Sequence, residues 1–122
     1  MELKTDSERP IFQQFAEELE DDILKGIFEE ETQIPSTTEV AIKFKINPAT
    51  ANRGVNLLVD EGIIYKRRGI GMFVAAGARE KIVSKRKAAF YDTYVLPLLR
   101  ESENLNLTKN EVINMIERRY NK

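Results

Sequence analysis

The chain has 122 residues, of which 42% are apolar and 32% charged, a balance typical of one soluble globular domain or of a small domain with a short appendage. It contains neither histidine nor cysteine, which excludes disulfides, His/Cys zinc sites and nucleophilic Ser-His or Cys-His pairs, and makes an enzyme less expected. Its apolar runs are far shorter than the roughly 20 residues that span a bilayer. Its polar start is unlike a signal peptide, so we expect a cytoplasmic protein with no membrane partner.

The net charge of −1 hides an uneven distribution of acidic and basic residues. Residues 1–33 hold eleven acids and three bases, residues 34–77 hold three acids and six bases, and residues 78–122 hold six acids and ten bases. Nucleic-acid binding does not require a basic protein if the positive charge is gathered on one face. The basic excess beyond residue 33 therefore permits a nucleic-acid-binding surface without requiring one.

Residues 10–26 are predicted to form an amphipathic helix, with Pro10 in the first turn and Gly26 as the stop. Its apolar residues recur at spacings of three and four, as one face of a helix requires: Phe12, Phe15, Ala16, Leu19 and Ile23. The acidic stretch that follows, residues 27–35, is predicted to be a solvated connection. Neither its acids nor the paired aspartates of the helix have converging partners in the sequence, so we predict no metal site there.

Two short helices are predicted next, over residues 36–44 and 47–62, and a tight link joins them. The Ser36 hydroxyl can accept from the amide of Glu39 while the Glu39 carboxylate reaches back, which is a capping box. Asn47 is the expected cap of the second helix, which has proline at its first position and glycine at its end. The apolar residues of the two helices form inner stripes: Val40, Ala41 and Phe44, then Ala51, Val55, Leu58 and Val59.

The stretch IYKRRGIGMFV combines three bases and two glycines between β-prone runs, and raises the question of a phosphate-binding loop. A nucleotide-binding fingerprint needs a third glycine and a helix that begins there, and neither follows. The two runs are therefore predicted to form a β-hairpin around KRRGIG. Lys66, Arg67 and Arg68 would place positive charge at its base, while Gly69 and Gly71 would let its tip approach DNA without Cβ clashes. Taken alone, the basic run is also typical of a solvated hairpin.

The last part of the chain is predicted to contain two further helices. Residues 78–102 are helical in pattern and strongly basic, and Pro97 should kink or interrupt this helix. Thr108 and Glu111 form a second capping box at the start of the final helix. The apolar stripe of the first of these helices is Val83, Phe90, Tyr94 and Leu98.

Helix, helix, short turn, helix and basic hairpin is the order of elements in a winged helix-turn-helix. We therefore predict a mainly α fold with a small β-hairpin. The predicted domains are a winged helix-turn-helix DNA-binding domain over residues 1–77 and a two-helix dimerisation tail over residues 78–122.

In a winged helix-turn-helix the second helix of the pair lies in the major groove, with its N-terminal residues at the base edges. Asparagine can pair with adenine, threonine or alanine can touch a thymine methyl group, and arginine can reach guanine or phosphate. An arginine of the hairpin gains from the negative potential of a narrow minor groove. The expected DNA-binding residues are Ser36, Thr38, Asn47, Ala49, Thr50, Asn52, Arg53, Lys66, Arg67, Arg68, Gly69 and Gly71.

These motifs carry a resemblance to a known family. Residues 9 to 76, with their Pro-Ser capping, the Asn-Pro-x-Thr helix start, DEGIIY and RRGxGxFV, resemble the DNA-binding domain of GntR-family bacterial transcription regulators. The segment LNLTKNEVINMIERRY is similar to the YtrA subfamily, in which two helices replace a large effector domain. The resemblance implies a homodimer with tail helices packed across a two-fold axis on a palindromic operator. It also implies a repressor, often of a transporter operon.

Two positions depart from the pattern of the family. Thr38 stands where the family commonly has an arginine that touches DNA, and Asn52 stands where the recognition helix usually carries a second basic residue. The departures imply fewer direct contacts to guanine and an operator or an affinity that differs from those usual in the family.

Other interpretations of the same residues stay open. The apolar stripe of the tail could be a private core, but two helices add little core to so small a domain, so we expect a shared one. The expected dimer-interface residues are Val83, Phe90, Tyr94, Leu98, Val112 and Ile116. Tyr91 and Tyr94 could line a pocket for an unknown small-molecule effector, although packing is the simpler role. The alternative function is a winged-helix adaptor that binds protein and not specific DNA. No cofactor and no metal are expected.

Overall fold

The computed structural model describes residue 3 and residues 9–121. The chain separates into two compact units, and the boundary between them lies after Val83, inside helix α4 (Ala78–Phe90). Ala78 and Ile82, in the first turns of this helix, are fully buried in the core of the first unit. The first unit therefore includes the start of the helix that leads into the second.

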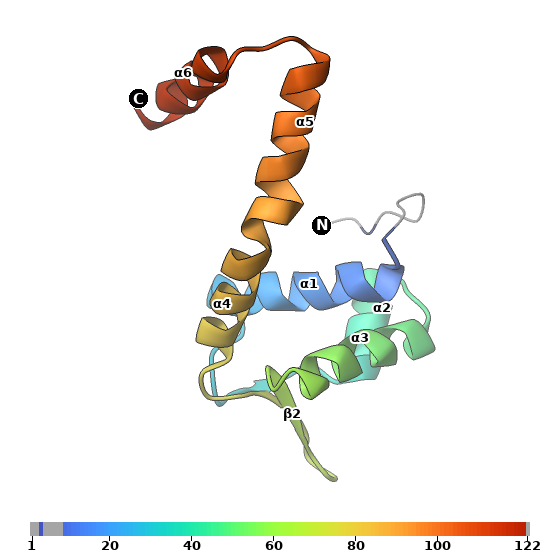
Figure 1. Cartoon of the computed structure of the whole chain (residues 1–122). Coiled ribbons are helices and arrows are strands. Elements are labelled where there is room, and N and C mark those ends of the chain that lie inside the picture. The colour runs from blue at the N-terminus through green and yellow to red at the C-terminus, as the bar shows by residue number, and fades with distance from the viewer. Residues whose placement is uncertain (1–2, 4–8, 122) are drawn as a thin grey trace. The chain divides into compact units, whose positions relative to one another are not determined.

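Three helices surround the core of the first unit: α1 (Ile11–Leu24), α2 (Thr37–Phe44) and α3 (Pro48–Asp60) (Figure 1). Both α1 and α2 contact α3. The buried apolar residues are Phe15, Ala16, Leu19, Ile23, Ile34, Val40, Ala41, Ala51, Val55, Leu58, Ile63, Ile64, Met72, Val74, Ala78 and Ile82. All the predicted stripe residues of the three helices except Phe12, Phe44 and Val59 are in this set, so the 3.6-residue periodicity predicted the core.

The contact between α1 and α3 depends on the glycine in the middle of α3. A Cβ atom on Gly54 would lie 2.7 Å from Phe15 Cδ2 and 2.8 Å from the Phe12 carbonyl oxygen. Phe15 is fully buried and meets the ring of Phe44 edge to face, with 5.4 Å between ring centroids. The absence of a side chain at Gly54 thus lets the two helices approach closely.

The predicted caps of the helix-turn-helix are confirmed. The Glu39 amide donates to Ser36 Oγ at 3.2 Å, and the Ser36 amide donates to Glu39 Oε1 at 3.3 Å. Asn47 Oδ1 accepts from the amide of Ala49 at 2.7 Å, and Pro48 begins α3. Each cap satisfies a backbone N–H that has no partner inside its helix, so α2 and α3 begin where their sequences dictate.

A small antiparallel sheet completes the first unit, with its strands in the order β1-β3-β2. β2 (Ile64–Arg67) and β3 (Gly71–Val74) form the predicted hairpin, which projects beyond the helices (Figure 1). β1 (Gln33–Ile34) pairs with β3 and was not predicted. It lies in the stretch expected to be a solvated connection, and its two residues are too few to show the alternation of a strand.

The second unit begins at Ser84 with the rest of α4. The helix continues through a π-helical segment, η1 (Tyr91–Val95), into α5 (Leu96–Asn104), and a turn leads to α6 (Lys109–Tyr120). Pro97 was expected to kink or interrupt the helix. The α-helical pattern is interrupted by η1 directly before Pro97, which lies in the first turn of α5, where the backbone N–H that proline lacks is tolerated.

The predicted capping box of the last helix is also present. The Glu111 amide donates to Thr108 Oγ1 at 3.1 Å, and the Thr108 amide donates to Glu111 Oε1 at 3.0 Å. Among the described residues from Ser84 onward, no apolar side chain is buried. The described part of the second unit is therefore a set of helices without an apolar core of its own, and a capping box begins the last of them.

Candidate nucleic-acid interface

Helix α3 presents polar residues on the side that faces away from the core. Ala51, Gly54, Val55 and Leu58 are its buried residues, and they leave its N-terminal turn at the surface. Of the residues expected to contact bases, Asn47, Ala49, Asn52 and Arg53 are exposed, and Thr50 is half-buried. The amide groups at this helix end also favour a phosphate. The N-terminal half of α3 is thus free to meet a ligand.

A further residue belongs to this surface. Asn56 lies seven positions after Ala49 and four after Asn52, so the three share one stripe of the helix. Lys66 Nζ, on β2, donates to Asn56 Oδ1 at 3.0 Å. The bond joins the hairpin to α3. Asn56 was missed in the sequence, although its spacing from the other two was a signal.

Arg53 is exposed and lies against α1. Its Cζ atom is 4.0 Å from the centroid of the Phe12 ring, a close cation–π arrangement. The stacking restricts the conformations of the arginine before any ligand binds, so Arg53 has less freedom to lose on binding. It therefore flanks the Ala49, Asn52 and Asn56 stripe as a partly ordered positive charge.

The loop of the hairpin is a tight turn of Arg68, Gly69 and Ile70. The Ile70 amide donates to the Arg67 carbonyl at 3.0 Å, and Gly69 has a φ of +76°, which glycine adopts without strain. Ile70 is 60% exposed at the tip. The tip therefore presents little side-chain bulk except one apolar group.

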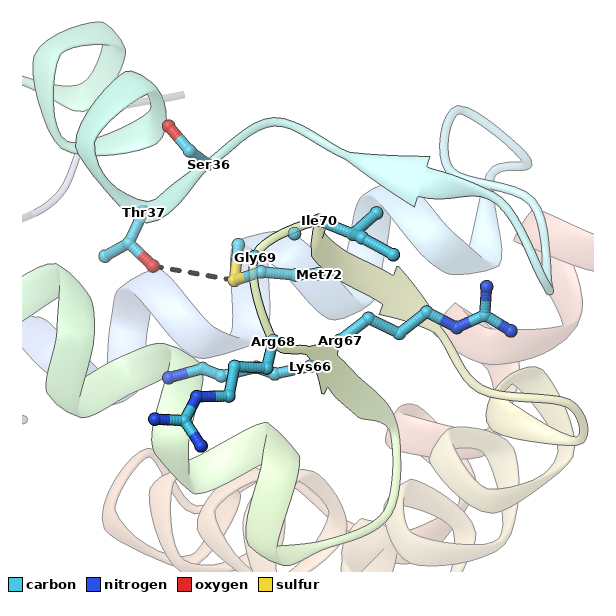
Figure 2. Close-up of a pocket in the computed structure, with 9 residues that line it drawn as sticks. Ser36, Thr37, Lys66, Arg67, Arg68, Gly69, Ile70 and Met72 are labelled. Carbon is cyan, nitrogen blue, oxygen red and sulfur yellow. Dashed lines mark hydrogen bonds between the residues drawn. The ribbon is translucent and has the colours of Figure 1, made fainter.

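The three bases of the hairpin do not point the same way. Strand alternation puts Lys66 on the face of the buried Ile64, and Arg67 on the opposite face. Figure 2 shows Lys66 and Arg68 extending to one side and Arg67 to the other. Arg67 Cζ lies 5.2 Å from the centroid of the Phe73 ring. Lys66 and Arg68 thus supply charge on the α3 side of the hairpin, and Arg67 on its outer side.

The start of α2 and the hairpin line one open depression of about 410 Å³ (Figure 2). Thr37 Oγ1, which lines it, donates to Met72 Sδ at 3.5 Å. Six predicted DNA-binding residues contribute to this depression: Ser36, Lys66, Arg67, Arg68, Gly69 and Gly71. The N-terminus of α2 and three basic residues border it, and no acidic side chain does, so positive charge lies at its edge although the three bases point to different sides.

The remaining predicted residues lie outside the depression. Thr38 is exposed on the first turn of α2, and the predicted residues of α3 form the separate surface described above. Gly71 also has a role within the fold. A Cβ atom there would lie 2.5 Å from Nε2 of Gln33, so its lack of a side chain accommodates a neighbour in the same chain.

The residues expected at a dimer interface are distributed over both units. Val83 ends the first unit and is half-buried. In the second unit, Phe90, Tyr94 and Leu98 are 55%, 65% and 47% exposed, and the rings of Phe90 and Tyr94 are 5.5 Å apart. Val112 is half-buried and Ile116 is 48% exposed.

Within residue 3 and residues 9–121, no group of three or more carboxylates is arranged to hold a metal ion. None of the helices in these ranges is long and apolar enough to cross a membrane.

Comparison with known proteins gives matches over most of the chain. Residues 12–74 match the family model described as bacterial regulatory proteins, gntR family. The HTH-type transcriptional regulator YhcF of Bacillus subtilis is 29% identical over 117 residues, which are 96% of this chain and 95% of YhcF. The HTH-type transcriptional repressor YtrA of the same organism is 32% identical over 77 residues, 63% of this chain and 59% of YtrA.

Solved structures show the same fold. A transcriptional regulator of the GntR family from Bacteroides thetaiotaomicron is 37% identical, with a TM-score of 0.73 over 91% of this chain and 96% of that one. The AraR DNA-binding domain, solved in complex with operator ORX1, is 28% identical, with a TM-score of 0.56 over 62% of this chain and 93% of that one. The second of these relatives was solved bound to DNA.

Proposed function

Since the chain belongs to the GntR family of bacterial regulatory proteins and is a DNA-binding regulator of transcription, we propose that it binds a palindromic operator as a homodimer and represses the genes that follow. Its relative YtrA is named a repressor, which supports the sign of regulation. That the regulated genes encode a transporter stays a prediction from the resemblance. A regulator of transcription acts where the chromosome lies, so we place the protein in the cytoplasm and assign it no catalytic activity.

One observation carries the proposed mode of binding: the exposed stripe of α3 and the basic depression are joined by the bond from Lys66 to Asn56. We assign Asn47, Ala49, Thr50, Asn52 and Arg53 to the base edges of the major groove. We assign phosphate binding to the residues that border the depression: Ser36, Lys66, Arg67 and Arg68. Thr38 flanks them. The tip of the hairpin, with Gly69 and Gly71, then reaches the minor groove as a wing.

The second unit supports the proposal of a homodimer. Its exposed large apolar residues are Phe90, Tyr91, Tyr94, Leu98, Leu99, Leu105, Ile113, Met115, Ile116 and Tyr120. So many exposed large apolar residues, on a unit whose described residues bury no apolar side chain, are expected to be covered by a partner. A second copy of the chain covers it most simply, because a two-fold axis then matches the symmetry of a palindromic operator. Tyr91 and Tyr94 leave a small-molecule effector open.

Paired substitutions test the assignment of the wing. Arg67→Ala with Arg68→Ala should weaken binding to the DNA upstream of the gene by at least about tenfold and lower the slope of log affinity against log salt by up to about two. Arg118→Ala with Arg119→Ala removes the same charge from α6 and is the matched control. Fluorescence anisotropy with labelled duplex across a salt series measures both quantities.

The same variants separate the proposal from its alternative. If the wing pair and the α6 pair bind DNA as the unchanged protein does, the wing does not contact DNA. A protein adaptor would in addition keep its protein partner after loss of Arg67 and Arg68, whereas a DNA-binding regulator loses retention on a DNA resin.

A further inference from the structure

The wing is held by a side chain from the strand that the sequence did not predict. Gln33 Nε2, on β1, donates to the carbonyl oxygen of Ile70 at 2.9 Å, across a separation of 37 residues. Ile70 stands at the tip of the wing, next to Gly69. The bond therefore joins the edge strand of the sheet to the part of the hairpin that projects farthest from the core.

The pairing of the strands explains how Gln33 reaches the tip. Gln33 pairs with Phe73, and Gly71 lies two residues from Phe73 on the same face of β3. The side chain of Gln33 therefore extends along β3 and lies over Gly71, with its Nε2 atom 2.5 Å from the position that a Cβ atom would occupy. Because Gly71 has no side chain, the amide group of Gln33 can lie against its backbone.

The two faces of the wing are tied to different elements. On the inner face, Lys66 Nζ bonds to Asn56 of α3 at 3.0 Å. On the outer face, which carries Arg67, Gln33 bonds to the tip. The turn itself contributes only its own bond, from the Ile70 amide to the Arg67 carbonyl. A hairpin joined to its domain on one face could still tilt about that face, and the second tie opposes the tilt.

We propose that Gln33 is a positioning residue for DNA binding, which clamps the tip of the wing so that Arg67 and Arg68 are held ready to meet the duplex. The inference rests on the proposed role of the wing in DNA binding. A wing that is already ordered loses less conformational freedom when it binds, and this difference appears as affinity. Gln33 does this through the backbone of Ile70 and without touching the DNA.

Loss of the hydrogen bond from Gln33 to Ile70 should weaken DNA binding by about three- to tenfold. This is the range expected for one hydrogen bond of ordinary net strength. Two variants remove this bond. Gln33→Ala removes the whole side chain, and Gln33→Met keeps its length but has no donor. Gln13→Ala, at an exposed glutamine of α1, is the matched control and should bind DNA as the unchanged protein does.

A double-mutant cycle distinguishes positioning from direct contact. The substitutions at Gln33 are combined with Arg67→Ala and Arg68→Ala, and the affinity of each variant for the upstream DNA is measured at fixed salt, with its thermal unfolding alongside. If Gln33 acts through the wing, its loss costs affinity only while the arginines are present. The thermal midpoint should remain near that of the unchanged protein, because Gln33 is exposed and outside the core.

Three results would overturn the inference. Unchanged affinity in Gln33→Met would show that the bond to Ile70 does not matter. An equal loss with and without the arginines would show that Gln33 contacts the DNA or acts elsewhere. A double arginine variant that binds like the unchanged protein would instead remove the wing from the proposed function, and the clamp with it.

Discussion

At the scale of single residues, Glu30 ties the connection after α1 to the start of α4. Its Oε1 accepts from the Gly77 amide at 2.8 Å and its Oε2 accepts from the Arg79 amide at 3.1 Å. Arg79 Nη1 in turn donates to the carbonyl of Leu24, the last residue of α1, at 2.8 Å. The two amides, and then the charge of Arg79, hold the pKa of the Glu30 carboxyl below its usual value.

The lowered pKa gives a prediction for stability against pH. A carboxyl group whose pKa is lower in the folded state stabilises the fold above its unfolded pKa, about 4.3 for glutamate, and the stabilisation disappears as the pH falls through the folded value. Glu30→Gln should therefore lower the thermal midpoint at pH 7, and the difference from the unchanged protein should vanish in strong acid. Calorimetric unfolding scans from pH 7 downward measure this.

Glu29→Gln is the matched control, since Glu29 is also an exposed glutamate of the same connection. It should follow the unchanged protein at every pH. A Glu30→Gln difference that grew as the pH fell would show that the carboxylate does not stabilise the fold through the amides of Gly77 and Arg79.

Residue-scale predictions succeeded where both partners are close in the sequence. The Ser36–Glu39 and Thr108–Glu111 capping boxes and the Asn47 cap involve neighbours within three residues, and all are present. Glu30, by contrast, meets partners 47 and 49 residues away, and Gln33 meets one 37 residues away. Nothing local in the sequence indicates such a partner, because only the folded sheet and helices bring the two together.

At the scale of elements, the N-terminus of α3 has a structural and a proposed functional role in the same residue. Asn47 caps the helix through the Ala49 amide and is exposed where we place the base edges. Asparagine and aspartate cap helices about equally well, whereas alanine does not. Aspartate adds a negative charge facing DNA. The two roles can therefore be separated by choice of substitution.

We expect Asn47→Ala to lower the free energy of unfolding by about 0.5–2 kcal/mol, because the Ala49 amide loses its partner. Asn47→Asp should keep the stability of the unchanged protein but bind the upstream DNA more weakly. Urea unfolding and anisotropy on the same preparations check both values. Binding by Asn47→Asp at full affinity would exclude Asn47 from the DNA surface.

The elements themselves could be predicted to different degrees. The helices of the first unit follow from apolar periodicity and caps, and the hairpin follows from two β-prone runs around glycines. β1 could not be predicted, because so short a strand is defined only by its pairing with β3. In that pairing Gln33 lies opposite Phe73, and Ile34 lies opposite Met72. The sequence marked Pro97 as a disturbance in the helix, but not that a π turn over Tyr91–Val95 would accommodate it.

At the scale of the whole molecule, the exposed apolar side chains of the second unit point to assembly with a partner chain. The second unit exposes large apolar side chains on α4, η1, α5 and α6 and buries none that the structure describes. The order of elements and the resemblance of residues 9 to 76 were enough to predict a winged helix-turn-helix regulator. The two-fold assembly depends on contacts between chains, so it stays a prediction, as do the interface residues.

Tyr94→Glu should convert the protein from a dimer to a monomer, because it would place a charge in the apolar interface that we propose. Light scattering after gel filtration measures the mass directly. The monomer should bind a palindromic site at least about tenfold more weakly, since linked half-sites no longer act together. Its affinity for a single half-site should not change.

Asn110→Glu, at an exposed polar position of α6, adds the same charge and is the control. It should remain dimeric. If Tyr94→Glu also remained dimeric, or if the unchanged protein were a monomer at micromolar concentration, the proposed interface would be wrong.

The central claim is recognition of specific DNA, and binding to the DNA upstream of the gene and to a scrambled duplex of equal length tests it most directly. The two affinities are measured across a salt series. Both should fall as salt rises, and the upstream DNA should keep an advantage of roughly a thousandfold or more. Equal and steeply salt-dependent affinities, or no binding to either duplex, would contradict the account.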